Sequence, residues 1–478
     1  MNPPARAGPA SPGGALPGGF AAAKDWHFAK TPYILPDSRP LPLLPLTQAS
    51  VKKLDLLTFG DELLLGIRDN GHLSYLGAEF ARQGLPIRRN LVVRDDPAEI
   101  EAAFRDAWAG ADIIVTTGGL GPTSDDNTRE VVARVLDLPL EFDPAAEAAI
   151  QERFARMNRR MVERDRKQCF RPRGTELLRN RHGTAPGIYF ERDGKILVLL
   201  PGPANELRPM FENEVLPRLR DAGVLSADEA YLQLRTCGLG ETMVEERIRP
   251  VVDRHPGCGL AFCAHQGMVD VRIASGAREF TRDELKAIGH ELREALGEDF
   301  VCFGHCCLAK IVLDELRARE ATLAVAESCT GGLLSNAFTD IPGASKIFLG
   351  GVVCYANDAK VQMLDVPEDL LLQHGAVSAE GAVALVTGAA ERFGVDYALS
   401  VTGFAGPGGG TENAPVGTIY LGYSSPVGVW SRKVVYSGDR LTVKARAVNA
   451  ALDWMRRKLL RYKVEDLLAA NYSVSEAS

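Results

Sequence analysis

The sequence predicts an α/β protein of three domains, and three observations lead to this prediction. The chain has 478 residues, and at about 150 residues per domain it is too long for a single hydrophobic core. Hydrophobic residues make up 46% and charged residues 24%, which is typical of a globular chain and excludes a largely disordered one. From Lys53 onward, apolar strands alternate with helices, which indicates a parallel sheet covered on both faces.

Changes in composition along the chain predict where the domains begin and end. The first 24 residues contain 17 Pro, Gly or Ala residues and lack the pattern of a signal peptide, so residues 1–50 are expected to form a disordered extension. Three domains are predicted at residues 51–222, 223–304 and 305–465, and a polar tail at 466–478.

The first domain is expected to be a three-layer α/β unit. Its strands are predicted at Leu54–Phe59, Ile87–Val93, Ile113–Thr116 and Ile196–Leu200, and its helices at Leu73–Gln83, Ala98–Trp108, from Thr128, and at Asn205–Phe211. Between Tyr231 and Phe303 the order strand, helix, strand, strand, helix, strand is typical of a small ferredoxin-like α+β unit. This second domain carries no polar cluster that suggests a site.

The third domain is predicted to be α/β as well. It begins with a helix at Leu308–Arg319 and a strand at Leu323–Ala326, and it closes with a long helix from Leu441 to about Leu460. After the strand comes Ala326-Glu-Ser-Cys-Thr-Gly-Gly, in which small residues open a helix. Backbone amides at a helix start can bind an anion or a developing oxyanion, with Ser328 beside them. Helix capping by Ser and Thr is the alternative interpretation.

Two further segments supply partners for a serine nucleophile. A strand at Ile347–Cys354 is followed by Tyr355 and, after a turn, by Lys360. A desolvated lysine can accept the proton of a serine, and a tyrosine can assist. Taken separately, Tyr355 is also compatible with a surface aromatic residue and Lys360 with a solvated one. The segment Thr402-Gly-Phe-Ala-Gly-Pro-Gly-Gly-Gly follows another strand and predicts a ligand-binding loop, with a flexible spacer as the alternative.

These motifs resemble the C-terminal domain of the CinA family, the nicotinamide-nucleotide amidase or NMN deamidase. The segments Gly350-Gly-Val-Val-Cys-Tyr-Ala-Asn-Asp-Ala-Lys and His374-Gly-Ala-Val-Ser complete the similarity, which covers most of residues 308–460. The resemblance implies hydrolysis of nicotinamide mononucleotide (NMN) to nicotinate mononucleotide and ammonia, a step of pyridine nucleotide recycling that needs no cofactor. It implies catalytic roles for Ser328, Tyr355 and Lys360 and substrate binding by Thr330, Gly331, Gly332, Thr402, Gly406, Gly408, Gly409 and Arg440.

The first domain is similar to the molybdopterin-binding fold of MoaB and MogA proteins, which CinA proteins share. The similar segments are Gly60-Asp-Glu-Leu-Leu-Leu-Gly, Thr116-Thr-Gly-Gly-Leu-Gly-Pro-Thr-Ser-Asp-Asp-Asn-Thr, Arg166-Lys-Gln, Gly183-Thr-Ala-Pro-Gly and Leu200-Pro-Gly-Pro. The resemblance implies metal-dependent ADP-ribose pyrophosphatase activity. Phosphate is expected at Gly118, Gly119 and Gly121, and a divalent metal at Asp125 and Asp126, which as an Asp-Asp-Asn run are also compatible with a helix cap.

Two departures from the family pattern leave open what the first domain does. Asp61 and the stretch Asn70-Gly71-His72 stand where the family commonly has Thr and Asn-Thr-Asn. The domain is therefore either a second enzyme or a non-catalytic module that binds a nucleotide or pterin. A third hypothesis makes the first domain the principal enzyme and the third domain a degraded partner, but the intact Ser328, Tyr355 and Lys360 argue against it.

Charge and cysteine content restrict the partners and the compartment. The balance of 55 Lys+Arg against 62 Asp+Glu gives a net charge of −7 without a basic block, which argues against nucleic-acid binding. Apolar runs are too short to span a membrane. Nine cysteines indicate reduced thiols in a cytoplasmic protein, and Cys302-Phe-Gly-His-Cys-Cys is expected to be buried small residues rather than a zinc site. We expect small nucleotide substrates and a homodimer.

Overall fold

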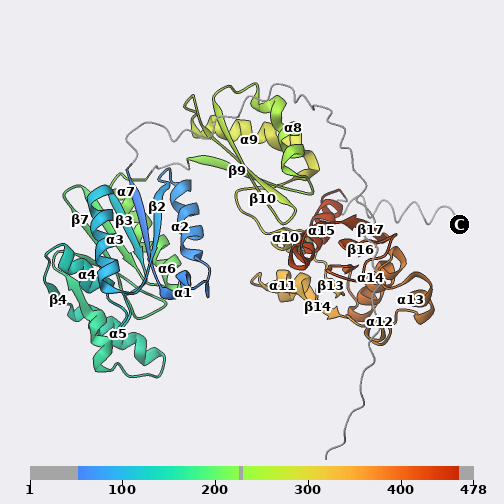
Figure 1. Cartoon of the computed structure of the whole chain (residues 1–478). Coiled ribbons are helices and arrows are strands. Elements are labelled where there is room, and N and C mark those ends of the chain that lie inside the picture. The colour runs from blue at the N-terminus through green and yellow to red at the C-terminus, as the bar shows by residue number, and fades with distance from the viewer. Residues whose placement is uncertain (1–51, 226–229, 462–478) are drawn as a thin grey trace, which may run out of the picture. The chain divides into compact units, whose positions relative to one another are not determined.

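The computed structural model describes residues 52–225 and 230–461, so the expected extension (1–50) and tail (466–478) lie outside the described residues. A six-stranded, a four-stranded and a five-stranded sheet follow one another along the chain, and a short two-stranded sheet accompanies the first (Figure 1). The predicted α/β class, with a small α+β unit between two α/β units, is confirmed. No helix in the described ranges is long and apolar enough to cross a membrane.

The first sheet has the order β2-β1-β3-β8-β7-β6. Strands β2, β1, β3 and β8 are parallel, β7 pairs antiparallel with β8, and β6 pairs antiparallel with β7. Its strands are β1 (Leu54–Phe59), β2 (Ile87–Val93), β3 (Ile113–Thr117), β6 (Glu176–Leu178), β7 (Gly187–Arg192) and β8 (Lys195–Leu200). The short sheet pairs β4 (Leu140–Phe142) with β5 (Phe170–Pro172).

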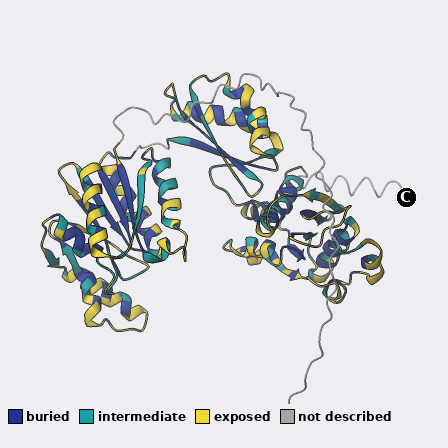
Figure 2. Cartoon of the chain, in the orientation of Figure 1, coloured by how far each residue is buried: buried dark blue, intermediate teal, exposed yellow. Residues whose placement is uncertain are grey.

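Helices cover both faces of this sheet. They are α1 (Asp61–Leu64), α2 (Gly71–Arg82), α3 (Pro97–Gly110), α4 (Thr128–Val135), α5 (Pro144–Arg156), η1 (Glu163–Cys169), α6 (Ala204–Met210), η2 (Phe211–Val215) and α7 (Leu216–Asp221). Because successive residues of a strand point to opposite faces, Leu56 of β1 joins the core with α2 and α6, and Leu57 joins the core with α3 and α4. The predicted three-layer arrangement is therefore present, with its strands buried between the helices (Figure 2).

The second domain has the antiparallel sheet order β10-β11-β9-β12, which is the ferredoxin-like arrangement predicted from the element order. Its elements are β9 (Tyr231–Cys237), α8 (Glu241–Val252), β10 (Cys258–His265), β11 (Met268–Ser275), α9 (Arg282–Leu296), η3 (Gly297–Asp299) and β12 (Phe300–Phe303). Apolar residues of α8 and α9, such as Ile248 and Leu292, form one buried cluster with the sheet.

The third domain contains the sheet β14-β13-β15-β16-β17, in which the first three strands are parallel, β16 pairs antiparallel with β15, and β17 pairs antiparallel with β16. Its strands are β13 (Leu323–Glu327), β14 (Phe348–Val353), β15 (Tyr397–Gly403), β16 (Thr418–Ser425) and β17 (Gly428–Val435). Its helices are α10 (Leu308–Ala318), α11 (Leu333–Thr339), η4 (Ala344–Lys346), α12 (Asn357–Leu364), α13 (Glu368–His374), α14 (Ala379–Phe393) and α15 (Arg440–Arg461).

Two buried clusters sandwich this third sheet. Val325 of β13 packs with α10, α11 and α15, and the next residue, Ala326, packs with α12 and α14 on the opposite face. A strand buried on both faces reads as a continuous apolar run, which is why β13 is recognisable in the sequence. The carboxyl ends of its parallel strands are the edge at which α/β proteins bind ligands.

One expectation about the cysteines is wrong. Cys302 and Cys306 form a disulfide with their Cα atoms 6.5 Å apart, whereas reduced thiols were predicted throughout. Gly304, at a φ of 70°, turns the chain back after β12 and brings the two residues together. The other seven cysteines are free, and no group of three or more His, Cys, Asp or Glu residues in the described ranges is placed to hold a metal.

Candidate functional site

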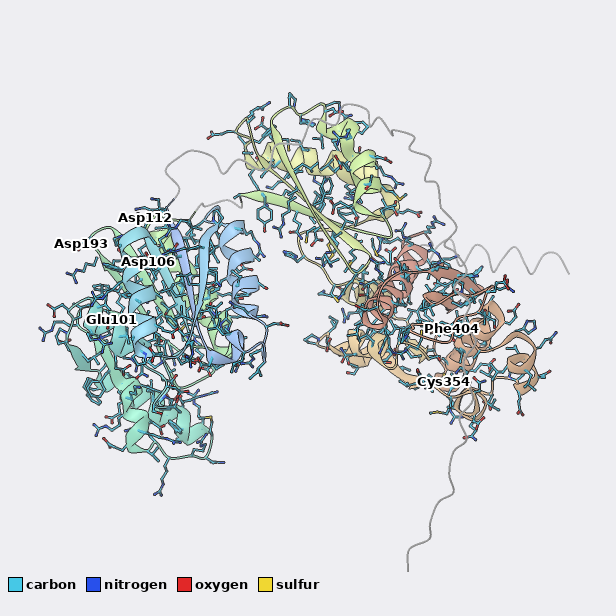
Figure 3. The ribbon with its side chains drawn as sticks, in the orientation of Figure 1. Glu101, Asp106, Asp112, Asp193, Cys354 and Phe404 are labelled. Atoms are coloured by element: carbon cyan, nitrogen blue, oxygen red, sulfur yellow. A yellow bond between two sulfur atoms is a disulfide. The ribbon has the colours of Figure 1, made fainter. Side chains whose placement is uncertain are left out.

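The carboxyl ends of three neighbouring parallel strands bring the predicted catalytic residues together. Glu327, the last residue of β13, pairs with Val353 of β14 on one side and with Val401 of β15 on the other. The amide of Ser328 donates to the carbonyl oxygen of Val401 at 2.9 Å. Ser328 therefore leaves the sheet at the same edge as the residues that follow β14 and β15, among them Cys354 and Phe404, which are labelled in Figure 3.

Glu327 holds the loop that carries Ser328, and the sequence analysis did not single it out. Its side chain is fully buried and accepts four hydrogen bonds. Oε2 accepts from the amides of Gly332 and Leu334 at 3.0 Å each, and Oε1 accepts from the amide of Ser335 at 2.7 Å and from its hydroxyl at 2.6 Å. The carboxylate thus binds the amides at the start of α11, where a negative charge is favourable.

These hydrogen bonds limit which backbone amides of the loop could bind an oxyanion. The amide of Gly332 is taken by Glu327, and the amide of Gly331 donates to the carbonyl oxygen of Ser328 at 3.2 Å. Within the described chain, the amides of Cys329 and Thr330 make no hydrogen bond to another residue. The amides available to an oxyanion are therefore those of Cys329 and Thr330, whereas Gly331 and Gly332 shape the loop at positive φ.

Ser328, and not the neighbouring thiol, has the properties of the nucleophile. Burial raises the pKa of Cys329 to about 12, so this thiol stays protonated at neutral pH. Ser328 itself is 9% exposed, beside the amides of the loop. A serine at this position needs a base to remove its proton.

Lys360 meets the requirements for such a base. It lies on α12, is 1% exposed, and donates from Nζ to the carbonyl oxygens of Tyr355 at 3.0 Å and Ala356 at 3.5 Å. No carboxylate among the described residues forms an ion pair with it. Burial lowers the pKa of Lys360, against weaker opposing effects of Cys354, Cys329 and Tyr355.

Tyr355 and Arg440 are joined although they lie far apart in the sequence. Arg440 Nη2 donates to the hydroxyl of Tyr355 at 3.1 Å, and its Nη1 donates to the carbonyl oxygen of Gly406 at 2.7 Å. The tyrosine side chain is 61% exposed, so it is accessible to a substrate. The first residue of α15 therefore connects the end of β14 with the glycine loop.

The remaining predicted substrate residues surround this centre with different roles. The hydroxyl of Thr402 is buried and donates to the carbonyl oxygen of Ala376 at 2.8 Å, which positions the loop before α14. Thr330 is fully buried, and its hydroxyl has no hydrogen-bond partner in the described structure. Gly408 and Gly409 lie exposed in the loop after Gly406.

The sequence analysis also missed Lys444. It lies one turn after Arg440 on α15, is half-buried, and its Nζ would be 3.7 Å from a Cβ placed on Gly331. Neither Arg440 nor Lys444 has a carboxylate partner in the part of the chain that is described. The i, i+4 spacing of the two cations was the available signal, because it places both on one face of a helix.

The predicted N-terminal residues also come together, around a cavity of about 500 Å³ in the first domain. Its lining includes Gly118, Gly119, Gly121, Asp125 and Asp126. The amide of Gly118 donates to the carbonyl oxygen of Leu200 at 3.0 Å, and a Cβ at Gly118 would lie 2.7 Å from the carbonyl oxygen of Phe59, so only glycine fits there.

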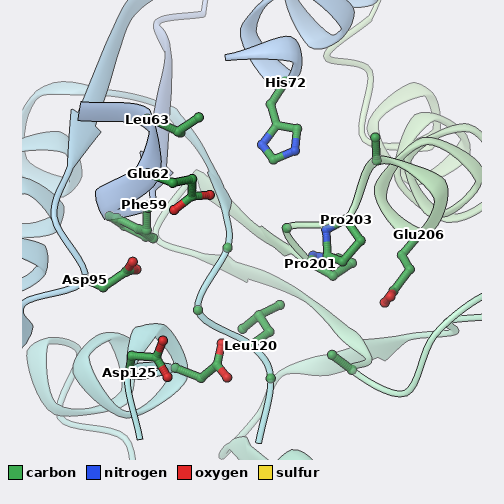
Figure 4. A pocket seen from close by; sticks show the side chains of 18 of the residues that line it. Phe59, Glu62, Leu63, His72, Asp95, Leu120, Asp125, Pro201, Pro203 and Glu206 are labelled. Atoms are coloured by element: carbon green, nitrogen blue, oxygen red, sulfur yellow. The ribbon is translucent and has the colours of Figure 1, made fainter. Parts of the chain in front are cut away.

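One wall of this cavity is acidic. Glu62, Asp95 and Asp125 lie on one side in Figure 4, and His72 lies across from Asp125. Burial raises the pKa of Asp95, and the charges of Asp61, Glu62 and Asp125 raise it further. The segment that departs from the family pattern thus contributes directly to the cavity, because Asn70, Gly71 and His72 line it.

His72 is held in a neutral state. Its Nδ1 lies 3.0 Å from the hydroxyl of Thr117, and burial lowers its pKa, with Arg68 and Arg208 adding to the effect and Gly202 and Glu62 opposing it. A neutral imidazole has one donor and one acceptor nitrogen, so it can form a hydrogen bond with a ligand.

The two aspartates predicted to bind a metal differ in availability. Asp126 Oδ2 accepts from the amide of Thr123 at 2.9 Å and from its hydroxyl at 2.5 Å, so its carboxylate stabilises the turn. Asp125 is exposed and belongs to the acidic wall. A hydrogen bond from Thr123 lowers the pKa of Asp125 as well, and metal binding by the pair stays a prediction.

Comparison with known proteins follows the division into three domains. Three family models match, described as "Probable molybdopterin binding domain" (residues 55–221), "Damage-inducible protein CinA KH domain" (233–302) and "CinA C-terminal domain" (306–459). KH domains hold nucleic acid with a Gly-x-x-Gly loop, and the sequence between 231 and 303 contains no such motif.

Relatives align with most of the chain. A competence-damage inducible protein of Caldicellulosiruptor bescii is 38% identical over 411 residues, which cover 85% of this chain and 99% of the relative. One of Symbiobacterium thermophilum is 40% identical over 421 residues, again covering 85% and 99%. A crystal structure of competence damage-inducible protein A from Klebsiella pneumoniae is 33% identical over 33% of this chain and 97% of its own, with a TM-score of 0.32. From the matching domain models and these relatives, the chain belongs to the CinA family.

Proposed function

We propose that the third domain hydrolyses the carboxamide of NMN to nicotinate mononucleotide and ammonia. The proposal rests on three features at one edge of the sheet. They are Ser328, the buried Lys360 with its lowered pKa, and two cations without a carboxylate partner, Arg440 and Lys444. The resemblance of the motifs to the nicotinamide-nucleotide amidase suggests the reaction, and the geometry supplies a nucleophile, a base and anion-binding groups for it.

Lys360 is positioned to act as a general base. Its two carbonyl acceptors, on Tyr355 and Ala356, can take both N–H bonds of a neutral amine. The lone pair then points away from these carbonyls and is free to accept the proton of Ser328 as Oγ attacks the carboxamide carbon. The lowered pKa of Lys360 increases the fraction of amine in this neutral form.

Backbone amides are available to donate hydrogen bonds to the negative charge that develops on the substrate. The amides of Cys329 and Thr330 would bind the oxyanion of the tetrahedral intermediate. When the C–N bond breaks, the Lys360 ammonium gives its proton to the carboxamide nitrogen, which leaves as ammonia, and the nicotinoyl group stays on Ser328 Oγ as an ester. Water activated by neutral Lys360 then hydrolyses the ester and restores the serine.

The cations of α15 fit the other end of the substrate. NMN carries a phosphate, and Arg440 and Lys444 offer charge on one helix face without a carboxylate to neutralise them. Arg440 also contacts the Tyr355 hydroxyl, so substrate binding there is linked to the nucleophile side of the site.

Ammonia release from NMN by the purified full-length chain tests this function. The expected result is turnover that falls at least about tenfold in Lys444→Met, mainly through KM, because a phosphate contact is lost. Exposed Arg432→Met, on β17, is the matched control for a lost cation. Absence of ammonia release by the wild-type chain at any NMN concentration would contradict the proposal.

For the first domain we propose binding of a nucleotide or pterin with a phosphate or pyrophosphate group. The support is the single cavity lined by all five residues predicted for this site. Arg68 and Arg208 also line it, and neither forms a side-chain ion pair within the described ranges. Metal-dependent cleavage of ADP-ribose stays a prediction, and its test is turnover of ADP-ribose with and without divalent cations and a chelator.

A further inference from the structure

The first domain has a second cavity, which contains none of the residues predicted for a site. It has a volume of about 600 Å³ and lies between α5 and the segment that follows β6. Among the described residues, Thr184 alone lines both this cavity and the 500 Å³ cavity, so the two are neighbours with different walls. We call it the arginine cavity after the arginines that line it, Arg153, Arg156, Arg179 and Arg181.

The two carboxylates of the arginine cavity are already neutralised. Asp143 caps α5, because its Oδ1 accepts from two amides of the first turn, and its Oδ2 accepts from Arg171 Nε at 3.0 Å. Glu152 forms an ion pair with Arg156, one turn later on the same helix. Neither carboxylate is therefore left to repel an anion that enters the cavity.

Three arginines of the cavity have no carboxylate partner. The side chains of Arg179 and Arg181 are exposed and form no hydrogen bond or ion pair within residues 52–225 and 230–461. Arg153 donates from Nη2 to the carbonyl oxygen of His182 at 2.6 Å, and no carboxylate in the same ranges pairs with it. Guanidinium groups bind carboxylates and phosphates through paired hydrogen bonds, so the free arginines favour an anionic ligand.

Asn180 folds the loop that carries two of these arginines. Its Oδ1 accepts from the amides two and three residues later, at 3.0 and 2.7 Å. Its Nδ2 donates to the carbonyl oxygen of Ala185 at 2.8 Å and to Glu206 Oε2 at 2.7 Å. The contact of Arg153 with His182 ties the same loop to α5. Because the backbone is fixed at these points, binding has to order only the arginine side chains.

One wall of the arginine cavity is apolar. It includes residues of α5, of β6 and of the chain that follows them, namely Ala146, Ala149, Ile150, Leu177, Leu178 and Pro186. Ligand pockets combine such apolar walls with a few polar groups that fix the orientation of the ligand. Inorganic phosphate gains nothing from this wall, whereas an anion with an apolar body removes it from water.

We propose that the arginine cavity binds an organic anion in which a carboxylate or a phosphate monoester is attached to a compact apolar body, such as an aromatic ring. The anionic group pairs with Arg179 and Arg181, and the apolar body lies against the wall of α5. The inference does not rest on the nucleotide-binding function proposed for the neighbouring cavity, because the cations and the apolar wall belong to the arginine cavity alone.

Calorimetry on the full-length chain tests the site with phenyl phosphate, benzoate and inorganic phosphate. Phenyl phosphate or benzoate should show saturable binding, and the tighter of the two identifies the anionic group. Inorganic phosphate should bind at least about tenfold more weakly, because it lacks an apolar body. Arg179→Gln combined with Arg181→Gln should weaken the organic probes at least about tenfold. Arg160→Gln combined with Arg164→Gln removes the same charge at exposed positions outside the cavity and should leave binding unchanged.

The apolar wall is tested by a variant of its own. Ala149→Leu fills the cavity from α5, so it should weaken the better organic probe more than inorganic phosphate. Ala148→Leu lies on the same helix outside the cavity and is the matched control. Both positions are exposed, so the melting temperatures should stay close to that of the wild type.

Three results would overturn the inference. The first is a wild-type chain that binds neither organic probe saturably. The second is equal weakening by the two double arginine variants, which would show general attraction by surface charge. The third is weakening by Arg208→Gln, in the neighbouring cavity, without weakening by Arg179→Gln combined with Arg181→Gln, because the probe would then bind in that other cavity.

Discussion

The Nζ atom of Lys360 lies 3.0 Å from the carbonyl oxygen of Tyr355, five residues before it in the chain. This contact bends the side chain back over the first turn of α12 instead of letting it extend into water. The amine is thereby buried. Burying an amine costs free energy, and packing alone does not explain why this lysine is buried. A catalytic role would explain it.

Replacement of Lys360 by methionine should separate activity from stability. The variant is expected to lose NMN turnover by a factor of about 10² or more, the contribution of a positioned base. Its melting temperature should be unchanged or higher, because a buried amine is replaced by an apolar group of similar length. Lys346→Met, at an exposed position of η4, is the control. Retained turnover in Lys360→Met would contradict the role of base.

The pH dependence of both activity and stability should depend on Lys360. Its pKa in the folded chain is lowered from the 10.5 of an ordinary lysine, so kcat/KM should rise with pH through that lowered value. Between the folded pKa and 10.5 the unfolded chain binds more protons, so the free energy of unfolding should also increase with pH in this window. Denaturant titrations at several pH values should show that Lys360→Met lacks this increase.

Ser328→Ala should abolish ammonia release and leave the fold intact. The hydroxyl that is removed makes no hydrogen bond to a described residue, so the melting curve should not change. Ser345→Ala, at an exposed position, serves as the control. Measurable turnover by Ser328→Ala after removal of wild-type contamination would argue for direct attack by water.

Glu327→Gln should lower both stability and kcat. The amide can accept at one end only, so the amide and hydroxyl of Ser335, or the amides of Gly332 and Leu334, lose their acceptor. The loss of hydrogen bonds to a buried charge is expected to cost about 3 kcal/mol in the free energy of unfolding. Denaturant unfolding and steady-state kinetics check this, with exposed Glu368→Gln as the control. A stable variant with normal kcat would show that Glu327 does not position the loop.

The aspartates of the first domain should respond differently to substitution. Asp126→Asn should lower the melting temperature, because Asp126 accepts two hydrogen bonds from Thr123. Asp125→Asn should leave the melting temperature unchanged and reduce any metal-dependent cleavage of ADP-ribose. Neither should alter NMN turnover, since the third domain supplies that site by itself. An equal loss of both activities in Asp125→Asn would contradict this independence.

Local patterns in the sequence were sufficient for the strands that carry the site. The run Leu323–Glu327 is apolar up to its last residue, and Ser328 follows it directly, so both the strand and the loop after it were predictable. The helix Ala379–Phe393 was not predicted, because its Gly, Ala and Thr residues give a weak amphipathic pattern. The antiparallel strand Gly428–Val435 was also missed, since its residues are largely exposed and polar ones interrupt the apolar pattern.

The roles of Glu327 and Lys444 required the structure. Glu327 looks like an ordinary polar residue at a strand end until its four donors are known. Lys444 looks like a solvated helix residue, and only the fold places it beside Gly331.

The position of helix α15 in the chain determines which part of the third domain is completed last during synthesis. Its apolar residues, such as Val443 and Met455, complete the core against α10, and its first residue, Arg440, contacts Tyr355. During synthesis the ribosome releases this helix after every other described element of the domain. Until α15 emerges, the nascent domain therefore lacks the α15 side chains of its core as well as Arg440 and Lys444, so the proposed substrate site can be completed only in the last step of assembly.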